Sequence, residues 1–364
     1  MLFRSVYGVE NLQEVIDFFE GKGTIEPTRI DTRAEFYKTL DFPEFDFSDV
    51  KGQESIKRCM EIAAAGGHNI ILIGPPGAGK TMLAKRLPSI LPPMTLREAL
   101  ETTKIHSVAG KLKEVGLMNQ RPFRSPHHTI SNVALVGGGS YPQPGEISMA
   151  HNGVLFLDEL PEFKRDVLEV MRQPLEDREV TISRAKFTVT YPSSFMLVAS
   201  MNPSPSGFFN DPDAPQTSSP HEMQRYMNKI SGPLLDRIDI HIEVTPVPFD
   251  KLSDDRKAEG SVEIRKRVTH AREIQSARFE PMPTIHYNAQ MNTKHIREFC
   301  ALDEPSKELL KNAMERLNLS ARAYDRILKV ARTIADLEAV EKVAAYHIAE
   351  AIQYRSLDRD GWLG

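Results

Sequence analysis

Three short, almost wholly apolar runs recur along the first two thirds of the chain. They are residues 69–73 (NIILI), 154–157 (VLFL) and 195–200 (FMLVAS). Such runs are typical of strands that are buried on both faces of a parallel sheet. Segments with helical spacing separate them, and this alternation extends from Phe47 to about Val247. The pattern predicts an α/β domain with a mostly parallel sheet.

The pattern becomes helical after this region. Residues 253–279 are predicted to form a long charged helix. Its narrow apolar seam consists of Ile264, Val268, Ala271 and Ile274. Pro281 and Pro283 then interrupt the chain. Helical spacing continues from 292 to 354, with Ser320 as a predicted N-cap. We expect a long helix and linker at 251–291 and an all-α domain at 292–364.

The first 48 residues form a separate stretch. A short helix is predicted from Asn11, because Glu14 follows at capping-box spacing. The stretch is too short to bury a core of its own. We therefore expect residues 1–48 to be the tail of an upstream domain and a linker, so that the chain is truncated relative to a longer protein.

Composition narrows the functional classes only a little. Of the 364 residues, 40% are hydrophobic and 26% are charged, as in ordinary globular proteins. The chain has no apolar run of membrane-spanning length, and its start lacks the apolar region of a signal peptide. No membrane contact is therefore expected, and the two cysteines, Cys59 and Cys300, are far apart, which favours a reducing, cytoplasmic location. The net charge of −4 gives no global indication of a nucleic-acid partner.

The first strong motif is GPPGAGKT at residues 74–81, between an apolar run and a helical pattern. Strand, glycine-rich loop and helix is the context that a phosphate-binding loop requires. Gly74, Gly77 and Gly79 let the backbone turn so that its N–H groups can point at phosphate oxygens. Lys80 can reach the β- and γ-phosphates, and the Thr81 hydroxyl can bind Mg²⁺.

Polar residues follow the other two predicted strands. Asp158 and Glu159 come directly after the second strand, where an Asp can hold Mg²⁺ and a Glu can activate water. Asn202 follows the third strand and could bond the γ-phosphate or the attacking water; it could equally be a turn-forming Asn before Pro203.

An arginine between two acids is the next candidate. Arg237 lies in SGPLLDRIDIHIEV (231–244) and could form a local ion pair with Asp236 or Asp239. It could also be an arginine finger that reaches the nucleotide of a neighbouring subunit. A finger is worth about 10³–10⁵ in rate, whereas an exposed ion pair is worth under about 1 kcal/mol.

Together these motifs resemble those of an AAA+ ATPase of the magnesium-chelatase-like branch, and most of all the bacterial ComM/YifB proteins. FRSPHHTIS, LVGGG, PGEISMAHNGVLFLDELPEF and SARAYDRILKVARTIADLE add to the resemblance, which covers residues 44–357. It implies a P-loop NTPase core with a three-layer α/β/α parallel sheet at 49–250, followed by the helical lid. The core would carry an insert at about 103–150 and a hairpin at about 178–190.

The resemblance also implies roles for single residues. Asn202 would be sensor one, Arg237 the finger and Arg322 sensor two, which contacts the γ-phosphate from the lid. The stretch 49–53 (DVKGQ) would line the adenine pocket, and the finger implies a hexameric ring. The residues expected to contact ATP are Val50, Gly52, Gln53, Gly74, Pro76, Gly77, Ala78, Gly79, Lys80, Thr81 and Met82. Thr81 and Asp158 are expected to hold Mg²⁺.

One departure from the family concerns metal binding. Family members often carry two Cys-x-Cys pairs after the sensor Asn, but here Ser204 and Ser206 stand at the first pair, and Gln216 and Ser218 at the second. Serine oxygens are poor zinc ligands. We therefore expect no zinc in this chain.

The segment 81–157 is much longer than the roughly 30 residues of a simple βαβ unit, so it holds an insertion. Residues 115–145 contain no acid, and neither do residues 180–210. Cations with an aromatic residue between them suit a phosphate backbone and its bases. The candidate DNA contacts are Arg121, Phe123, Arg124, His127 and His128 in the first window and Arg184 and Lys186 in the second.

These windows leave more than one function open. We hypothesise that they line a pore and move single-stranded or branched DNA as ATP turns over, because repeated copies in a ring add avidity. ComM-like proteins are associated with DNA branch migration in natural transformation. RPFRSPHH could instead be a structural loop. The competing functions are a chelatase-type motor that drives a metal-insertion partner and a nucleotide-switched scaffold.

Overall fold

The computed structural model describes residues 7–27, 45–112, 116–184, 188–207, 219–247, 258–282, 284–355 and 357. The chain divides into two units, Met1–Asp41 and Phe42–Gly364, which are described separately. In the first unit, α1 (Leu12–Phe19) begins after Asn11, whose side chain accepts a hydrogen bond from the Glu14 N–H as the sequence predicts. None of the residues of α1 is buried.

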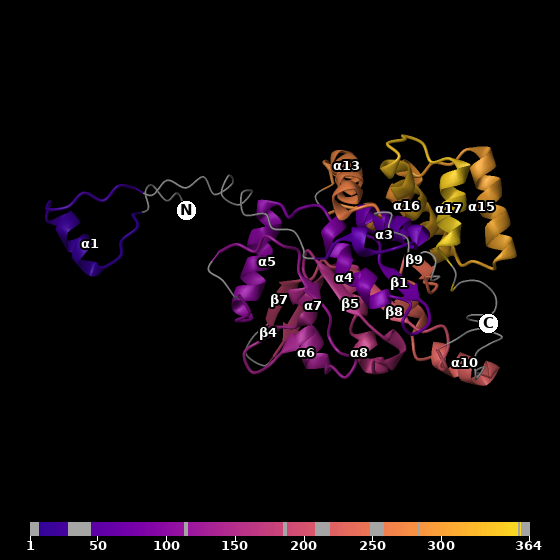
Figure 1. Ribbon diagram of the computed structural model, residues 1–364, viewed down its shortest axis with the longest axis horizontal. Coiled ribbons are helices and arrows are strands. Elements are labelled where there is room, and N and C mark those ends of the chain that lie inside the picture. Colours follow the sequence, from indigo (N-terminus) through magenta and orange to yellow (C-terminus); the bar gives the residue numbers. More distant parts are fainter. Residues whose placement is uncertain are drawn as a thin grey trace. The chain divides into compact units, whose positions relative to one another are not determined.

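The second unit is built on a parallel sheet of five strands (Figure 1). The strand order is β2-β5-β8-β1-β9. The bounds are β1 Ile70–Ile73, β2 Phe123–Arg124, β5 Val154–Leu157, β8 Met196–Met201 and β9 Ile240–Glu243. In register, Ile70 lies opposite both Val198 and Ile240. β1, β5 and β8 are completely buried, which confirms the interpretation of the three apolar runs.

Alternate residues of the central strands enter two separate cores, one on each face of the sheet. Ile70 and Leu72 belong to one core, and Ile71 and Ile73 to the other. The first face is covered by α3 (Glu54–Gly66), α4 (Lys80–Ile90) and helices of the C-terminal part. The second is covered by α7 (Glu146–Met149), α8 (Arg165–Glu169), α10 (Pro220–Met227) and α11 (Gly232–Leu235). The result is a three-layer α/β/α fold (Figure 1).

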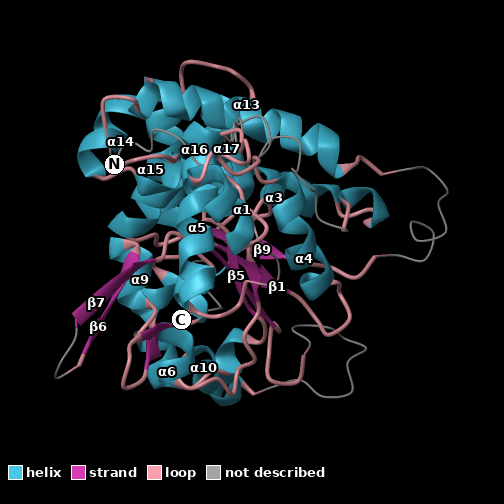
Figure 2. Cartoon of the chain, turned by 90° about the vertical axis from the view of Figure 1, so that its left-hand side faces the viewer, coloured by secondary structure: helices cyan, strands magenta, loops and turns pink. Residues whose placement is uncertain are grey.

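The long segment between α4 and β5 contains several short elements. They are α5 (Leu96–Val108), β2, α6 (Asn132–Val136), the ribbon β3 (Gly137–Gly138) with β4 (Gln143–Pro144), and α7. Beyond β5 lie η2 (Leu160–Glu162), α8, α9 (Arg172–Asp177) and an antiparallel hairpin of β6 (Glu179–Ser183) and β7 (Thr188–Pro192) (Figure 2). η1 (Phe47–Asp49) opens the unit. β2 adds an edge strand that the apolar pattern does not reveal.

The C-terminal part is helical, as predicted. It contains α13 (Ser261–Phe279), η3 (Asn288–Gln290), α14 (Thr293–Phe299), α15 (Glu304–Arg316), α16 (Ala321–Leu337) and α17 (Ala345–Gln353). Ser320 caps α16 by accepting a hydrogen bond from the Ala323 N–H. The seam of α13 differs in one place: Gln275 is fully buried, whereas Ile274 is only half-buried.

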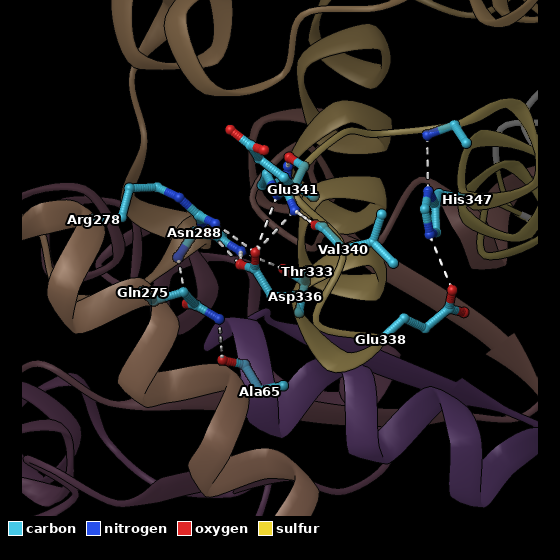
Figure 3. A network of polar contacts seen from close by, with 12 residues as sticks. Ala65, Gln275, Arg278, Asn288, Thr333, Asp336, Glu338, Val340, Glu341 and His347 are labelled. Atoms are coloured by element: carbon cyan, nitrogen blue, oxygen red, sulfur yellow. Dashed lines mark hydrogen bonds and ion pairs between the residues drawn. The ribbon is translucent and has the colours of Figure 1, made fainter.

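A buried polar network explains why a glutamine occupies that seam (Figure 3). Gln275 donates to the Ala65 carbonyl at 3.0 Å and accepts from the Asn288 N–H at 3.0 Å. Asn288 in turn donates to Asp336, which also pairs with Arg278. Because each polar group has a partner, the network ties α13 and α16 to the end of α3 without leaving a buried group unsatisfied.

None of the helices in the described part of the chain has the length and apolar character needed to cross a membrane.

Candidate functional site

The glycine-rich loop lies at the carboxyl end of β1. Gly77 and Gly79 have φ values of +79° and +90°, which favour glycine. A Cβ at Gly74 would lie 2.3 Å from the carbonyl oxygen of Val244, the residue that follows β9, so the backbone there approaches the loop too closely for any side chain. Lys80 then begins α4, whose N-terminus faces the loop. The loop therefore has the geometry that phosphate binding requires.

The ammonium of Lys80 joins the loop to the third strand. Its Nζ donates to the carbonyls of Gly74 at 2.5 Å and Pro75 at 2.9 Å, and to Oδ1 of Asn202 at 3.1 Å. Burial lowers the pKa of Lys80, although Asp158 counteracts the shift. Asn202 thus lies beside the loop, as expected, and Lys80 can exchange its carbonyl contacts for phosphate oxygens.

The hydroxyl and the carboxylate expected to hold the metal are in contact. Thr81 Oγ1 donates to Oδ2 of Asp158 at 2.8 Å. The other oxygen of Asp158 accepts a hydrogen bond from Ser200, a residue of β8 that the sequence analysis missed. An oxygen pair of this kind suits Mg²⁺. Ser200 was missed because only strand pairing brings it opposite Asp158.

Glu159 leaves the strand in a left-handed conformation. Its φ is +54°, and its N–H donates to the Ser200 hydroxyl at 3.2 Å. Its side chain is 57% exposed, and Oε2 lies 3.6 Å from Nδ1 of His128. Glu159 also lines a pocket of about 390 Å³ together with Asn202 and Tyr226. The carboxylate can therefore meet a water molecule beside the phosphate loop.

Two further side chains shape this edge of the sheet. The Tyr226 hydroxyl donates to the backbone carbonyl of Asn202 at 3.2 Å, and burial raises the pKa of Tyr226. Gln53 donates to the carbonyls of Ala78 (3.2 Å) and Thr245 (3.1 Å) and has φ +58°. Gln53 thus ties the 49–53 stretch to the loop, in the neighbourhood where the adenine pocket is expected.

Arg237 and Arg322 lie at the opposite edge of the sheet. Asn69, which directly precedes β1, accepts from the Asp239 N–H at 2.9 Å and donates to the Arg237 carbonyl at 2.9 Å. Gly74 directly follows β1, and four strand residues span roughly 13 Å. Arg322 pairs with Asp236 at the same amino edge. Neither arginine therefore reaches the phosphate loop of its own chain in this arrangement.

This position differs from the one expected for Arg322. A lid residue can contact the γ-phosphate of ATP bound to its own chain only if it lies beside the phosphate loop of that chain. Arg322 instead shares an edge with Arg237, whose guanidinium pairs with Glu176 and the Pro233 carbonyl. Burial lowers the pKa of Arg237, and nearby Arg172 adds to the effect. Both arginines line a cleft of about 770 Å³.

Three of the candidate DNA contacts have partners within the chain. Arg121 pairs with both oxygens of Glu98, at 3.0 and 3.2 Å. Arg124 pairs with both oxygens of Glu146, at 2.6 and 2.7 Å. Phe123 packs inward against Phe156, with ring centroids 6.0 Å apart. The window lacks acids in sequence but not in space, because α5 and α7 supply them.

The other candidates have different positions. His127 is exposed and stacks on His128, with ring centroids 4.1 Å apart. Arg184 is exposed directly after β6, and within the described residues its guanidinium donates to the carbonyl of the neighbouring Ser183. Lys186 lies outside the described residues. His127 and Arg184 therefore remain accessible to a ligand.

The serines that replace the first Cys-x-Cys pair face each other. Ser204 Oγ and Ser206 Oγ are 2.9 Å apart, at hydrogen-bond distance. Gln216 and Ser218 lie outside the described residues. The absence of zinc stays a prediction.

The chain is similar to known proteins along nearly its whole length. The family model for magnesium chelatase, subunit ChlI, matches residues 46–252, and that for the ChlI C-terminal region matches residues 258–355. The chain is 44% identical to competence protein ComM of Haemophilus influenzae over 98% of its own length and 69% of ComM. It is 45% identical to YifB of Escherichia coli over 96% of its length and 67% of YifB. Similarity to the chloroplastic magnesium-chelatase subunit ChlI of rice is 22% over 48% of each chain.

Proposed function

Since the chain belongs to the magnesium-chelatase-like family of AAA+ ATPases that includes the ComM and YifB proteins, we propose that it hydrolyses ATP in sites shared between neighbouring copies and uses the energy to act on DNA. The observation that supports the shared site most strongly is the position of Arg237 and Arg322. Both lie at the amino edge of the sheet, whereas the phosphate loop lies at the carboxyl edge.

Each residue of the carboxyl edge has a role in this proposal. Lys80 and the loop N–H groups bind the β- and γ-phosphates, and Thr81 and Asp158 hold Mg²⁺. Mg²⁺, when bound, offsets the negative charge that develops on the phosphates. Glu159 accepts a proton from the attacking water, and the Asn202 amide orients that water. Ser200 keeps the Asp158 carboxylate turned toward Thr81.

The neighbouring copy supplies the missing cations. Arg237 and Arg322 face the γ-phosphate of ATP bound to the adjacent copy and stabilise its charge in the transition state. To do so, Arg237 exchanges the Glu176 carboxylate for phosphate oxygens, and Arg322 exchanges the Asp236 carboxylate in the same way. A head-to-tail contact of this kind closes into a ring, which we propose to be a hexamer.

Mixing two inactive variants tests the shared site. Lys80→Ala lacks a working phosphate loop but keeps its arginines, and Arg237→Ala has the reverse defect. Separately, we expect each to lose ATPase activity by at least about 10³-fold. After random equimolar mixing, about a quarter of interfaces join an intact loop to an intact arginine, so activity should return. A mixture as inactive as its components would overturn the proposal.

The DNA role is supported by the similarity to competence protein ComM and by the exposed positions of His127 and Arg184. ComM-like proteins are associated with DNA branch migration. We propose that His127, His128 and the β6–β7 hairpin, with Arg184 and Lys186, contact the DNA backbone. Arg121 and Arg124 are not included, because each donates to both oxygens of a single carboxylate, a bidentate pairing that Arg237 and Arg322 lack within the described residues.

The ATPase rate with and without single-stranded, duplex and forked DNA tests this role. Stimulation by DNA that is lost in a His127→Ala, Arg184→Ala double variant would support it. The second candidate function is a chelatase-type motor, which the match to the ChlI family models favours. An ATPase rate that none of the DNA forms changes would favour the chelatase-type motor.

A further inference from the structure

The cleft at the amino edge of the sheet is positively charged, although the whole chain has a net charge of −4. Eight Lys or Arg residues and five Asp or Glu residues line its volume of about 770 Å³. A concave site of this size is within the range of pockets that bind small molecules. The excess of cations indicates an anionic ligand.

Each of the five acids already has a cationic partner in the same cleft. The pairs are Arg97 with Glu101, Arg121 with Glu98, Arg237 with Glu176, Arg322 with Asp236, and Arg326 with Asp239. Three cations are left over. Arg178, Arg272 and Lys329 form no ion pair with any carboxylate in the described part of the chain. We call these three side chains the cation floor.

The cation floor converges on one short segment from three separate elements. Arg178, which ends α9, donates to the Thr284 carbonyl at 3.2 Å. Lys329 of α16 donates to the Ala289 carbonyl at 2.9 Å. Arg272 of α13 stacks on the Tyr287 ring at 3.7 Å. All three therefore contact the segment 284–289 and line the same cleft.

The contacts of the cation floor use only part of its donors. Lys329 has three N–H groups and donates to one carbonyl, while Arg178 has five and also donates to one. The Lys329 residue is only 9% exposed, so water cannot fully solvate its charge. Burial lowers the pKa of Lys329 to about 8 and that of Arg272 to about 10. A bound anion would offset the cost of holding these charges out of water.

We propose that the cation floor binds a small phosphate-bearing anion: inorganic phosphate, pyrophosphate or the phosphate tail of a nucleotide. Spare N–H groups of Arg178 and Lys329 donate to the phosphate oxygens, which are strong acceptors. The site differs from the proposed contact with a neighbour's ATP in the side chains it uses, although Arg237 and Arg322 line the same cleft. It needs a single chain only, so it does not depend on ring assembly.

Calorimetric titration tests the proposal in Lys80→Ala protein, which removes phosphate binding by the glycine-rich loop. Inorganic phosphate, pyrophosphate and ATP are titrated separately, and the tightest of the three identifies the source of the phosphate. We expect saturable binding to one site per chain. Arg178→Gln and Lys329→Met should each raise the Kd at least about tenfold, the effect of one lost charge-assisted hydrogen bond. Lys307→Gln, an exposed lysine paired with Glu304, is the matched control.

Chemical labelling gives a second measurement that needs no substitution in the cleft. Pyrophosphate should slow the acetylation of Lys329 by acetic anhydride in Lys80→Ala protein and leave Lys307 unchanged. The proposal is overturned if none of the three anions binds and Lys329 is not protected. It is also overturned if the two variants weaken binding of a short oligothymidylate and leave pyrophosphate binding unchanged, because the cation floor would then contact DNA.

Discussion

Ser200 donates a hydrogen bond from its hydroxyl to Oδ1 of Asp158, and the same hydroxyl accepts the N–H of Glu159. One side chain of β8 therefore orients the proposed metal ligand and the start of the segment that carries the proposed base. Groups that orient a metal ligand typically contribute a factor of about 10–100 to metal affinity or activity. This factor corresponds to about 1.4–2.7 kcal/mol of free energy.

We expect Ser200→Ala to raise the Mg²⁺ concentration for half-maximal ATPase activity by about 10–100-fold. The reason is that Asp158 would lose the donor that holds its carboxylate beside Thr81. A magnesium titration of the ATPase rate measures this shift. Ser183→Ala, an exposed serine of β6, serves as the control. An unchanged magnesium midpoint in Ser200→Ala would show that strand pairing alone positions Asp158.

Asp336 is the centre of the buried network that docks α16 (Figure 3). Its side chain is completely buried and accepts from Arg278, Arg332 and Asn288. Asp336→Ala should lower the free energy of unfolding by about 3–5 kcal/mol, because two buried cations lose their counter-charge. Urea denaturation measures the change. Glu315→Ala, which breaks an exposed pair with Lys311, should cost under about 1 kcal/mol.

Lys329 should make stability depend on alkaline pH. Burial lowers its pKa to about 8, with Asp239 and Asp325 opposing the shift and Arg326 and Arg178 adding to it. The unfolded chain keeps an ordinary pKa near about 10.4, so it binds more protons than the folded chain between these values. The free energy of unfolding should therefore rise with pH from about 8 to about 10.4, by up to about 3 kcal/mol.

Comparison with Lys329→Met isolates this contribution from other groups that titrate in the same range. The difference in unfolding free energy between the wild-type protein and the variant should increase with pH over the window. Urea denaturation at pH 7, 8, 9 and 10 provides the measurement. Parallel curves for the two proteins would mean that Lys329 has an ordinary pKa in the folded chain.

Arg124 separates a structural role from a DNA role. Arg124→Ala should lower the free energy of unfolding by about 1–3 kcal/mol, because Glu146 loses a bidentate partner. We expect the salt dependence of DNA binding to stay unchanged, whereas Arg184→Ala should reduce its slope by about one. Fluorescence anisotropy across a salt series distinguishes them. If the salt slope is reduced in Arg124→Ala and unchanged in Arg184→Ala, then the prediction that RPFRSPHH contacts DNA would be supported.

Much of the core fold was predictable because its signals are local. The apolar runs that became β1, β5 and β8, the phosphate loop and the Ser320 cap each depend on residues close together in sequence. β2 was not predictable in this way, because it is a two-residue edge strand whose only partner strand among the described residues is β5. Gln275 was missed for a similar reason, since its partners Ala65 and Asn288 come from other elements.

The sequence by itself determined the parallel core, its phosphate loop and the acids that follow its strands, because contiguous spacing specifies strand, turn and helix. Only the tertiary structure decided which partners the arginines Arg121, Arg124 and Arg322 have. It supplied Glu98 to Arg121 and Glu146 to Arg124 from outside the acid-free window. It also placed Arg322 at the sheet edge opposite its own phosphate loop, because the position of a lid residue depends on how α16 packs against the core and not on any local pattern.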